Sequence, residues 1–177
     1  MVEARDRARV LRNRKVGLIV AAIIFLADQA VKWAVVDILQ LQQRKEIGLL
    51  PIFSLRWVEN RGVSMGLFTA GSDSARWALV AMTAAIAIFV AVWLWRERQR
   101  QDATALSLVL GGALGNIADR VRLGYVVDYA DLHFGDISPF LVFNVGDAAI
   151  TIGVLLLLVR ALLTRDKAPA REESEHA

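Results

Sequence analysis

Four long apolar stretches, separated by short charged segments, dominate the chain. They cover approximately residues 17–36, 76–95, 104–121 and 140–160. Each approaches the roughly 20 residues that an α-helix needs to cross the hydrocarbon core of a bilayer. A buried helix of a water-soluble domain rarely runs so far without a polar face. The pattern therefore predicts four transmembrane helices.

Lysine and arginine flank these stretches unevenly. The basic clusters lie in the N-terminal segment, in the link after the second stretch and after the fourth stretch (Arg5, Arg7, Arg9, Arg12, Arg14 and Lys15; Arg96, Arg98 and Arg100; Arg160, Arg165, Lys167 and Arg171). The positive-inside rule places these three segments, and with them both termini, on the cytoplasmic side. The 21 basic and 18 acidic residues give a net charge of +3, and because topology explains their placement we expect no nucleic-acid partner.

The two remaining links, residues 37–73 and 122–139, then face outward. Residues 52–58 alternate partly between apolar and polar side chains and are rich in β-favouring types, which predicts a short strand or small sheet on the outer surface. The sequence Asn60-Arg61-Gly62 is typical of a turn. Residues 166–177 are polar and are expected to form a disordered cytoplasmic tail.

These patterns together predict the fold class. We expect an all-α membrane protein with four transmembrane helices and a small extramembrane β-sheet on the outer, periplasmic side. Residues 1–165 would form a single integral-membrane domain, because a chain of 177 residues has no room for a second large domain.

Composition narrows the chemistry. The chain has no cysteine and only two histidines, His133 and His176, the second in the polar tail. Disulfides, thiolate zinc sites, cysteine nucleophiles and imidazole-rich metal sites are thereby excluded. His133 with Asp131 and Asp136 is better interpreted as a solvated outer loop than as a metal cluster, and Ser138 has no spacing that supports a catalytic triad with His133. We expect neither a metal nor a cofactor.

Costly polar residues within the apolar stretches fall at one depth. Counted from the cytoplasmic start of its stretch, Asp28 lies about 17 Å up, Asn116 about 18 Å and Asp119 about 22 Å. In the descending fourth stretch, Asn144 and Asp147 lie about 6 Å and 11 Å below the outer boundary, which in a ~30 Å core is nearly the same layer. An intramembrane carboxylate costs a few kcal/mol unless it is paired or hydrated, so the shared depth indicates a site.

The spacing of these residues suggests how they meet. Asn116 with Asp119, and Asn144 with Asp147, are pairs three residues apart, which places both members on one helix face. A strand-like piece between the two pairs can return a third carboxylate, Asp128, to the same interface. Paired carboxylates in a region of low dielectric share a proton, so that one acts as base and the other as acid. Such a pair can activate water and polarise a peptide carbonyl without a metal or a covalent intermediate.

Structural interpretations stay open for several of these residues. Asp28 and Lys32, four residues apart, form either an ion pair that stabilises the first helix or part of the site. Asp119 beside Arg120 can likewise be a structural pair at a helix end. The G-x-x-x-G pattern of residues 111–115 favours close helix packing over ligand contact.

Two other functions also stay open. A small proton-coupled membrane transporter would use intramembrane carboxylates as proton relays. It would need a polar path through both halves of the bilayer, yet the inner halves of the four stretches contain almost no polar residue. A noncatalytic membrane scaffold would leave the shared depth of the carboxylates unexplained.

Five ordered motifs cover nearly the whole chain apart from its two ends. They are Asp28-Gln29 with Lys32; Asn60-Arg61-Gly62; Gly111-Gly112-Ala113-Leu114-Gly115-Asn116 followed by Asp119-Arg120; Val126-Val127-Asp128; and Phe143-Asn144-Val145 with Asp147. In this order and topology the sequence resembles the lipoprotein signal peptidase (signal peptidase II) family of bacterial membrane aspartic proteases. Any one motif alone would be weak, and together they are highly specific.

The resemblance implies a membrane aspartic endopeptidase that removes signal peptides from bacterial prolipoproteins by cutting just before the lipid-modified cysteine. By motif match, Asp128 and Asp147 would be the catalytic dyad. The resemblance further assigns Asn116, Asp119, Arg120 and Asn144 to positions that shape or support the site, and Asp28, Lys32, Asn60 and Arg61 to positions around the substrate groove. The family also has a small extramembrane β-structure, in agreement with the strand pattern.

The resemblance also implies a multi-pass protein of the bacterial cytoplasmic (inner) membrane with its active site near the outer face. Its partners would be lipid-modified prolipoproteins and membrane lipid, and we expect a monomer. Two departures from the family pattern stand out. Val63-Ser64-Met65 follows the Asn60-Arg61-Gly62 turn, where a small residue and then an aromatic are usual, and Gly146 stands where alanine is usual. Sequence drift is the favoured explanation for Gly146, so alanine there should raise stability and keep activity.

Overall fold

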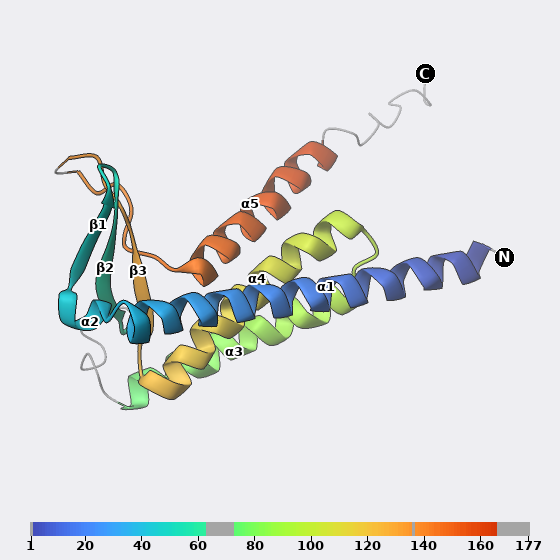
Figure 1. The fold of residues 1–177 in the computed structure, drawn as a ribbon. Helices are drawn as coiled ribbons and strands as arrows, with labels where there is room; N and C mark the ends of the chain where they lie inside the picture. Colours follow the sequence, from blue (N-terminus) through green and yellow to red (C-terminus); the bar gives the residue numbers. More distant parts are fainter. Residues whose placement is uncertain (1, 63–72, 136, 166–177) are drawn as a thin grey trace, which may run out of the picture.

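The computed structural model describes residues 2–62, 73–135 and 137–165 (Figure 1). In chain order the elements are α1 (Val2–Trp33), the π-helical turn η1 (Ala34–Ile38), α2 (Leu41–Arg44), β1 (Glu46–Leu50), β2 (Phe53–Asn60), α3 (Asp73–Arg96), α4 (Arg100–Leu123), β3 (Val126–Leu132) and α5 (Val145–Arg165). The expectations for residues 63–65 and for the tail at 166–177 lie outside the described residues.

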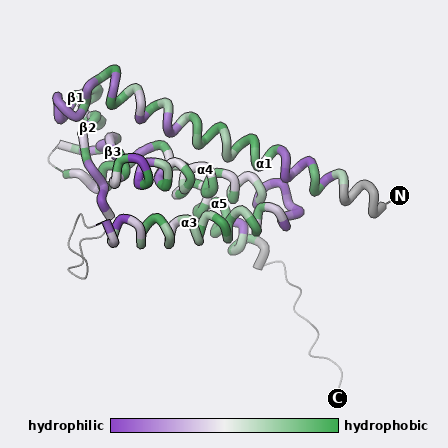
Figure 2. The backbone as a smooth tube through the Cα atoms, turned by 90° about the horizontal axis from the view of Figure 1, so that it is seen from below, coloured by the Kyte–Doolittle hydropathy of each residue, from purple (hydrophilic) through white to green (hydrophobic). Residues whose placement is uncertain are grey.

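Four long helices run side by side, and the central one is α4, which packs against α1, α3 and α5 (Figure 1). Within the described part of the chain, three helices are long and apolar enough to cross a membrane: Ala8–Ile38, Asp73–Arg96 and Val145–Leu163. Hydrophobic residues follow the middle of the long helices, and hydrophilic ones gather toward the sheet (Figure 2). The protein is thus mostly helical, with apolar helices suited to a bilayer.

The helix α4 is less apolar than α3 and α5 because it carries charges near both ends. Its central position explains how these polar groups are tolerated, since three other helices surround it and can bind them. The glycines that begin the G-x-x-x-G pattern let the neighbours come close. A Cβ added at Gly111 would lie 2.6 Å from the Ala21 carbonyl oxygen, so the close packing expected from the sequence is confirmed.

The predicted boundaries need one correction at the last helix. We expected an apolar span from residue 140, but α5 begins only at Val145. The preceding residues are held as extended chain against the sheet, because Phe143 and Ala130 exchange backbone hydrogen bonds of 2.8 and 3.0 Å. Asn144 then caps the helix, as described below. Phe140 and Leu141 are apolar yet lie in an exposed loop rather than in the helix.

The predicted sheet is present, and it has three antiparallel strands in the order β1-β2-β3. Figure 1 shows it standing across the helix ends that lie opposite the N-terminus. Beneath it is a small core of six buried apolar residues, Val35, Leu41, Leu55, Val127, Tyr129 and Ala130. In the register of β2 with β3, Val58 pairs with Asp128, so the sheet carries this carboxylate over the ends of the helices.

Candidate active site

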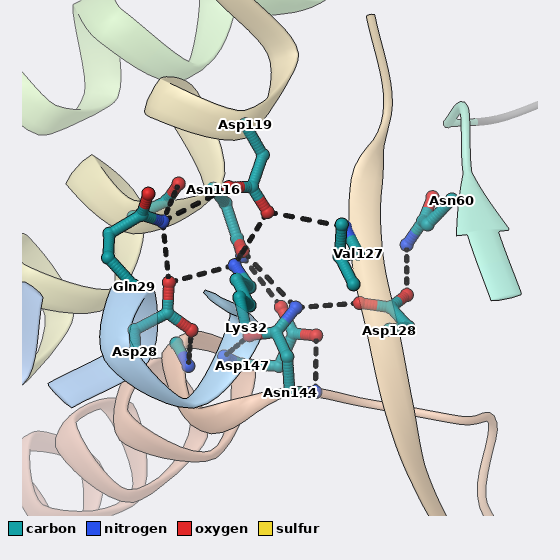
Figure 3. Close-up of polar contacts among 12 residues, drawn as sticks. Asp28, Gln29, Lys32, Asn60, Asn116, Asp119, Val127, Asp128, Asn144 and Asp147 are labelled. Atoms are coloured by element: carbon teal, nitrogen blue, oxygen red, sulfur yellow. Dashed lines mark hydrogen bonds and ion pairs between the residues drawn. The ribbon is translucent and has the colours of Figure 1, made fainter. Parts of the chain in front are cut away.

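Polar side chains from α1, α4, β3 and the start of α5 meet where the sheet crosses the helices (Figure 3). The residues Asp28, Asn116, Asp128 and Asn144 are buried, with exposed fractions between 0% and 7%. Asp147 is half-buried. The structure therefore brings together the polar residues that the sequence placed at one depth.

The first turn of α5 fixes Asp147 through a reciprocal cap. The Asn144 side-chain oxygen accepts a hydrogen bond from the Asp147 backbone N–H at 2.9 Å. In return, Asp147 Oδ2 accepts one from the Asn144 backbone N–H at 3.2 Å. This is the geometry of a capping box, in which two otherwise unsatisfied N–H groups at a helix start are bound by side chains. The three-residue spacing places both residues on one helix face. It also lets each side chain bind the backbone N–H of the other, which fixes the Asp147 carboxylate at the start of the helix.

Asn116 connects α4 to the same carboxylate. Its Nδ2 donates to Asp147 Oδ1 at 2.7 Å, so both oxygens of Asp147 accept hydrogen bonds. Its Oδ1 accepts from Lys32 Nζ and from Asn144 Nδ2, each at 3.2 Å. Because an ammonium can only donate, the contact with Lys32 fixes the amide with its NH₂ group toward Asp147.

Asp128 receives two amide donors from different elements. Asn144 Nδ2 donates to its Oδ1 at 2.6 Å, and Asn60 Nδ2, at the end of β2, donates to its Oδ2 at 3.0 Å. Burial and then the neighbouring Asp147 carboxylate raise the pKa of Asp128 to about 6, although the hydrogen bonds from the two amides oppose the shift. Asn144 therefore bridges the two carboxylates and holds each in place.

The two carboxylates differ in access. Asp147 lines a cavity of about 510 Å³ between α5 and the loop that follows β3, whose other walls are almost entirely apolar (Leu132, Pro139, Phe140, Leu141, Phe143, Ala148, Thr151 and Ile152). Asp128 is only 2% exposed. A substrate in this cavity would thus meet Asp147 directly.

A second carboxylate cluster lies beside the first, on α1 and α4. The Lys32 ammonium lies 2.8 Å from an oxygen of Asp28 and 2.8 Å from an oxygen of Asp119. The other Asp28 oxygen accepts from the Gly146 backbone N–H at 2.9 Å, which ties α1 to the start of α5. The i, i+4 pair of Asp28 and Lys32 is therefore a buried ion pair, and it lies next to the site rather than apart from it.

Two participants were missed by sequence reasoning. Gln29 Nε2 donates to Asp28 at 3.2 Å and to Asp119 at 3.0 Å, and the backbone N–H of Val127 donates to Asp119 at 3.2 Å. Gln29 follows Asp28 directly in the first motif, and this position is the sequence signal that could have identified it. The Val127 contact is a backbone bond that no side-chain pattern encodes.

Several other predicted residues lie at the margin. Arg61 is exposed, pairs with Glu59 at 2.6 Å and lies over the Tyr125 ring, 5.4 Å from its centroid. Arg120 follows Asp119 on α4, and its Nε is buried without a hydrogen-bond partner among the described residues. Asp119 pairs with Lys32, so the Asp119–Arg120 pairing considered from sequence is not what binds this carboxylate.

The described residues of the loop around His133 do not form a metal site. Asp131 lies 3.7 Å from Arg56, and Asp136 lies outside the described residues. In the described ranges, no three His, Cys, Asp or Glu side chains are grouped so that they could hold a metal ion. The chemical groups of the site are therefore the carboxylates of Asp128 and Asp147, which amide groups hold beside an apolar cavity.

Comparison with known proteins gives one consistent family. The signal peptidase (SPase) II family matches residues 20–163. A lipoprotein signal peptidase of Rhizorhabdus wittichii is 59% identical over 159 residues, which are 89% of this chain and 92% of that relative. One of Sphingopyxis alaskensis is 55% identical over 152 residues, covering 86% of this chain and 88% of the relative. A solved bacterial membrane enzyme is 26% identical, with a TM-score of 0.71 over 84% of this chain and 93% of its own.

The matched range takes in every residue of the two carboxylate clusters, from Asp28 on α1 to Asp147 on α5. The relatives are similar across nearly their whole length, so the likeness covers the bundle and the sheet together. The chain belongs to the signal peptidase II family.

Proposed function

We propose that this protein is a membrane aspartic endopeptidase that removes signal peptides from bacterial prolipoproteins, cutting just before the lipid-modified cysteine. The observation that carries the proposal is the pair Asp128 and Asp147, bridged by Asn144 and held by amide donors, with one member open to an apolar cavity. Family membership and the names of the relatives support the same activity. The reaction needs no metal and no cofactor.

The two aspartates take different roles. We assign the acid role to Asp128, because burial and the neighbouring carboxylate raise its pKa and so favour its protonated form. Asp147 faces the cavity, and we assign it the role of the base that takes a proton from a water molecule. The water oxygen bonds to the scissile carbonyl carbon while Asp128 gives its proton to the carbonyl oxygen, which forms a neutral gem-diol.

Breakdown of the gem-diol restores both groups. Asp147 passes its proton to the leaving amide nitrogen, and the carbon–nitrogen bond breaks. Asp128 recovers a proton from a gem-diol hydroxyl as the new carboxylic acid forms. The carboxamide groups of Asn116 and Asn144 keep both carboxylates oriented throughout, so little reorganisation is needed between the steps.

Four helices cross the bacterial inner membrane in this proposal, α4 included, with both termini in the cytoplasm. At the N-terminal end of the bundle, Arg14 Nε donates to the Trp95 carbonyl at 2.7 Å and the guanidinium lies 4.6 Å from the Trp95 ring centroid. Arginine and tryptophan together are typical of a membrane interface. The basic link between α3 and α4 is at this end, so the sheet and the dyad lie at the outer face.

The substrate reaches the dyad from the lipid. Its signal peptide is itself an apolar helix, and the cavity beside Asp147 is walled by apolar side chains of α5 and the loop after β3. The scissile bond would then lie over Asp147 with the mature protein outside. A monomer suffices, since Asp128 and Asp147 come from one chain.

The direct test incubates the purified full-length protein, in lipid nanodiscs, with a synthetic diacylglyceryl-modified precursor and follows the shift on a gel. The same precursor with serine in place of the modified cysteine is the control. We expect cleavage of the modified precursor alone, unchanged by EDTA. No cleavage by folded protein overturns the proposal, and proton flux without cleavage in proteoliposomes supports the transporter. Activity that EDTA removes and a divalent ion restores would make the carboxylates metal ligands.

A further inference from the structure

Large apolar side chains are exposed at one edge of the structure outside the long helices. Two segments contribute them, the tip of the β1–β2 hairpin and the loop after β3. We name them the apolar rim: Leu49, Leu50, Ile52, Phe134, Ile137, Phe140 and Leu141. Their exposed fractions run from 45% at Ile52 to 91% at Leu141. A contiguous apolar patch is rare on a surface that faces water and marks an interface.

The hairpin tip has the wrong chemistry for a turn in water. Turns are usually built from glycine, proline, asparagine, aspartate and serine, and of these only Pro51 is present here. Here the last two residues of β1 and the two that join it to β2 run Leu-Leu-Pro-Ile from Leu49 to Ile52. This composition favours surroundings in which apolar side chains are stabilised.

The two segments of the rim are held together by backbone hydrogen bonds. The His133 N–H donates to the Ile52 carbonyl at 3.0 Å, which joins the loop to the hairpin tip. Phe134 and Ile137 exchange backbone hydrogen bonds of 2.8 and 3.2 Å, which join these two residues of the loop to each other. The rim is therefore an ordered surface built on the sheet.

The rim continues the lipid-facing surface of α5. Figure 1 shows the hairpin tip and the loop after β3 at the same end of the sheet, on the side of α5. Ile152 and Leu155 on α5 are each 52% exposed. Phe140 and Leu141 of the rim also line the cavity beside Asp147, together with Ile152. One apolar surface thus runs from the side of the helix, past the cavity, to the tip of the sheet.

We propose that the apolar rim is immersed in the outer leaflet of the bilayer beside α5, and that membrane lipid is its partner. The rim is continuous with a helix that is suited to span the membrane, and a surface joined to lipid-facing side chains meets the same solvent. The proposal rests on the proposed function only in placing the sheet at the outer face.

Immersion of the rim has a consequence for the reaction. Because Phe140 and Leu141 belong both to the rim and to the cavity wall, the cavity opens to lipid rather than to water. A membrane-bound substrate can then diffuse in the bilayer plane to Asp147 without leaving the leaflet. Because the loop after β3 is attached to the sheet, the sheet sets the depth of the cavity opening in the bilayer.

The absence of cysteine in the sequence makes a site-specific test clean. Single spin labels are attached at Leu50→Cys and Leu141→Cys in nanodiscs without substrate, and their collisions with oxygen and with a water-soluble nickel chelate are measured. Leu155→Cys on α5 is the lipid-facing reference, and Glu46→Cys, at the exposed far end of β1, is the aqueous reference. The measurement needs no catalysis, so it stands apart from the cleavage assay.

A functional test uses paired variants. Leu50→Asp places a charge in the rim but outside the cavity wall, and Gln42→Asp places the same charge on exposed α2. Leu50→Asp should raise the KM for the modified precursor in nanodiscs several-fold, with little effect in detergent micelles. Gln42→Asp should change neither. Equal KM values for the two variants in nanodiscs would count against a lipid-immersed rim.

The collision measurements decide the proposal. We expect both rim labels to resemble Leu155→Cys, with frequent oxygen collisions and few nickel collisions. Rim labels that resemble Glu46→Cys would overturn it. Rim labels shielded from both reagents, with spin–spin broadening that disappears on dilution with unlabelled protein, would overturn it in favour of a contact between two copies.

Discussion

Two carboxylate clusters lie side by side in this protein, and they are bound by different donors. In one, Asp28 and Asp119 share the Lys32 ammonium at 2.8 Å. In the other, Asp128 and Asp147 receive hydrogen bonds from carboxamide and backbone N–H groups. A cation keeps a buried carboxylate ionised, whereas neutral donors orient it and leave its proton exchangeable. The first cluster is thus suited to structure and the second to chemistry.

Asn116 joins the clusters, because its oxygen accepts from Lys32 while its nitrogen donates to Asp147. The ammonium is therefore linked to Asp147 through a neutral amide, and its charge also opposes the rise in the pKa of Asp128. If the two clusters have these separate roles, changes in one should affect cleavage and changes in the other should affect stability first.

The largest effect is expected from the dyad itself. Asp128→Asn and Asp147→Asn should each lower cleavage by about 10²- to 10⁴-fold, because neither carboxylate can be both base and acid. Cleavage of the modified precursor in nanodiscs and thermal unfolding in detergent are measured together. Both variants should still unfold cooperatively, since an amide fills the same space as the carboxylate. Activity above a tenth of wild type in either variant removes that residue from the dyad.

The next effect concerns the ion-paired cluster. Lys32→Met leaves Asp28 and Asp119 buried without their cation, and breaking such a pair should destabilise the protein by about 3–5 kcal/mol. Unfolding free energy from denaturant titration in detergent measures this. Lys15→Met, an exposed lysine on the same helix, is the matched control and should have almost no effect. A Lys32→Met protein as stable as this control would show that the ammonium does not hold the cluster together.

The sequence correctly predicted which polar residues lie together, but it did not predict the geometry of their contacts. Apolar runs located the helices because length and hydropathy are properties of a continuous segment. The three-residue spacing of Asn144 and Asp147 correctly linked them, yet the structure makes them a helix cap at the start of α5 instead of two groups within a span. The start was placed too early because Phe140 and Leu141 extend the apolar run into a loop.

The hydrogen bonds that the sequence did not predict join segments that are far apart along the chain. The bond from Gly146 N–H to Asp28 spans 118 positions, and the one from Asn60 to Asp128 spans 68. Such pairings depend on helix packing and strand register, which no local pattern encodes. The resemblance assigned Asp28 and Lys32 to the surroundings of the substrate groove, and the structure places both in the buried cluster behind the dyad.

The third prediction uses the raised pKa of Asp128. Folding raises this pKa from 3.8 to about 6, so the folded state favours the protonated form. The stability that comes from this protonation is fully present below about pH 4 and is lost as pH rises through about 6, a fall of about 3 kcal/mol at most. Asp128→Asn should lack this fall. Unfolding free energies of both proteins at pH 4 and pH 7 measure it, and parallel changes in the two would contradict the shift.

The smallest effect is expected at Gly146, which touches both clusters. Its N–H binds Asp28, and a Cβ added to it would lie 3.0 Å from the Asn144 side-chain oxygen and 3.3 Å from that of Asn116. Those amides orient the dyad, so Gly146→Ala should displace them by a few tenths of an ångström. We expect cleavage to fall roughly three- to tenfold, since small misplacements at a reacting centre are costly.

Stability should respond in the opposite direction or hardly at all. Alanine in a helix gains about 1 kcal/mol over glycine in backbone entropy, and the tight contacts offset part of that gain. The cleavage rate and the unfolding midpoint are therefore measured on the same samples of Gly146→Ala. Gly48→Ala is the control, because a Cβ at Gly48 meets nothing within 4 Å. A stabilised Gly146→Ala protein that cleaves at the wild-type rate would restore the drift interpretation and show that the amides tolerate the added methyl group.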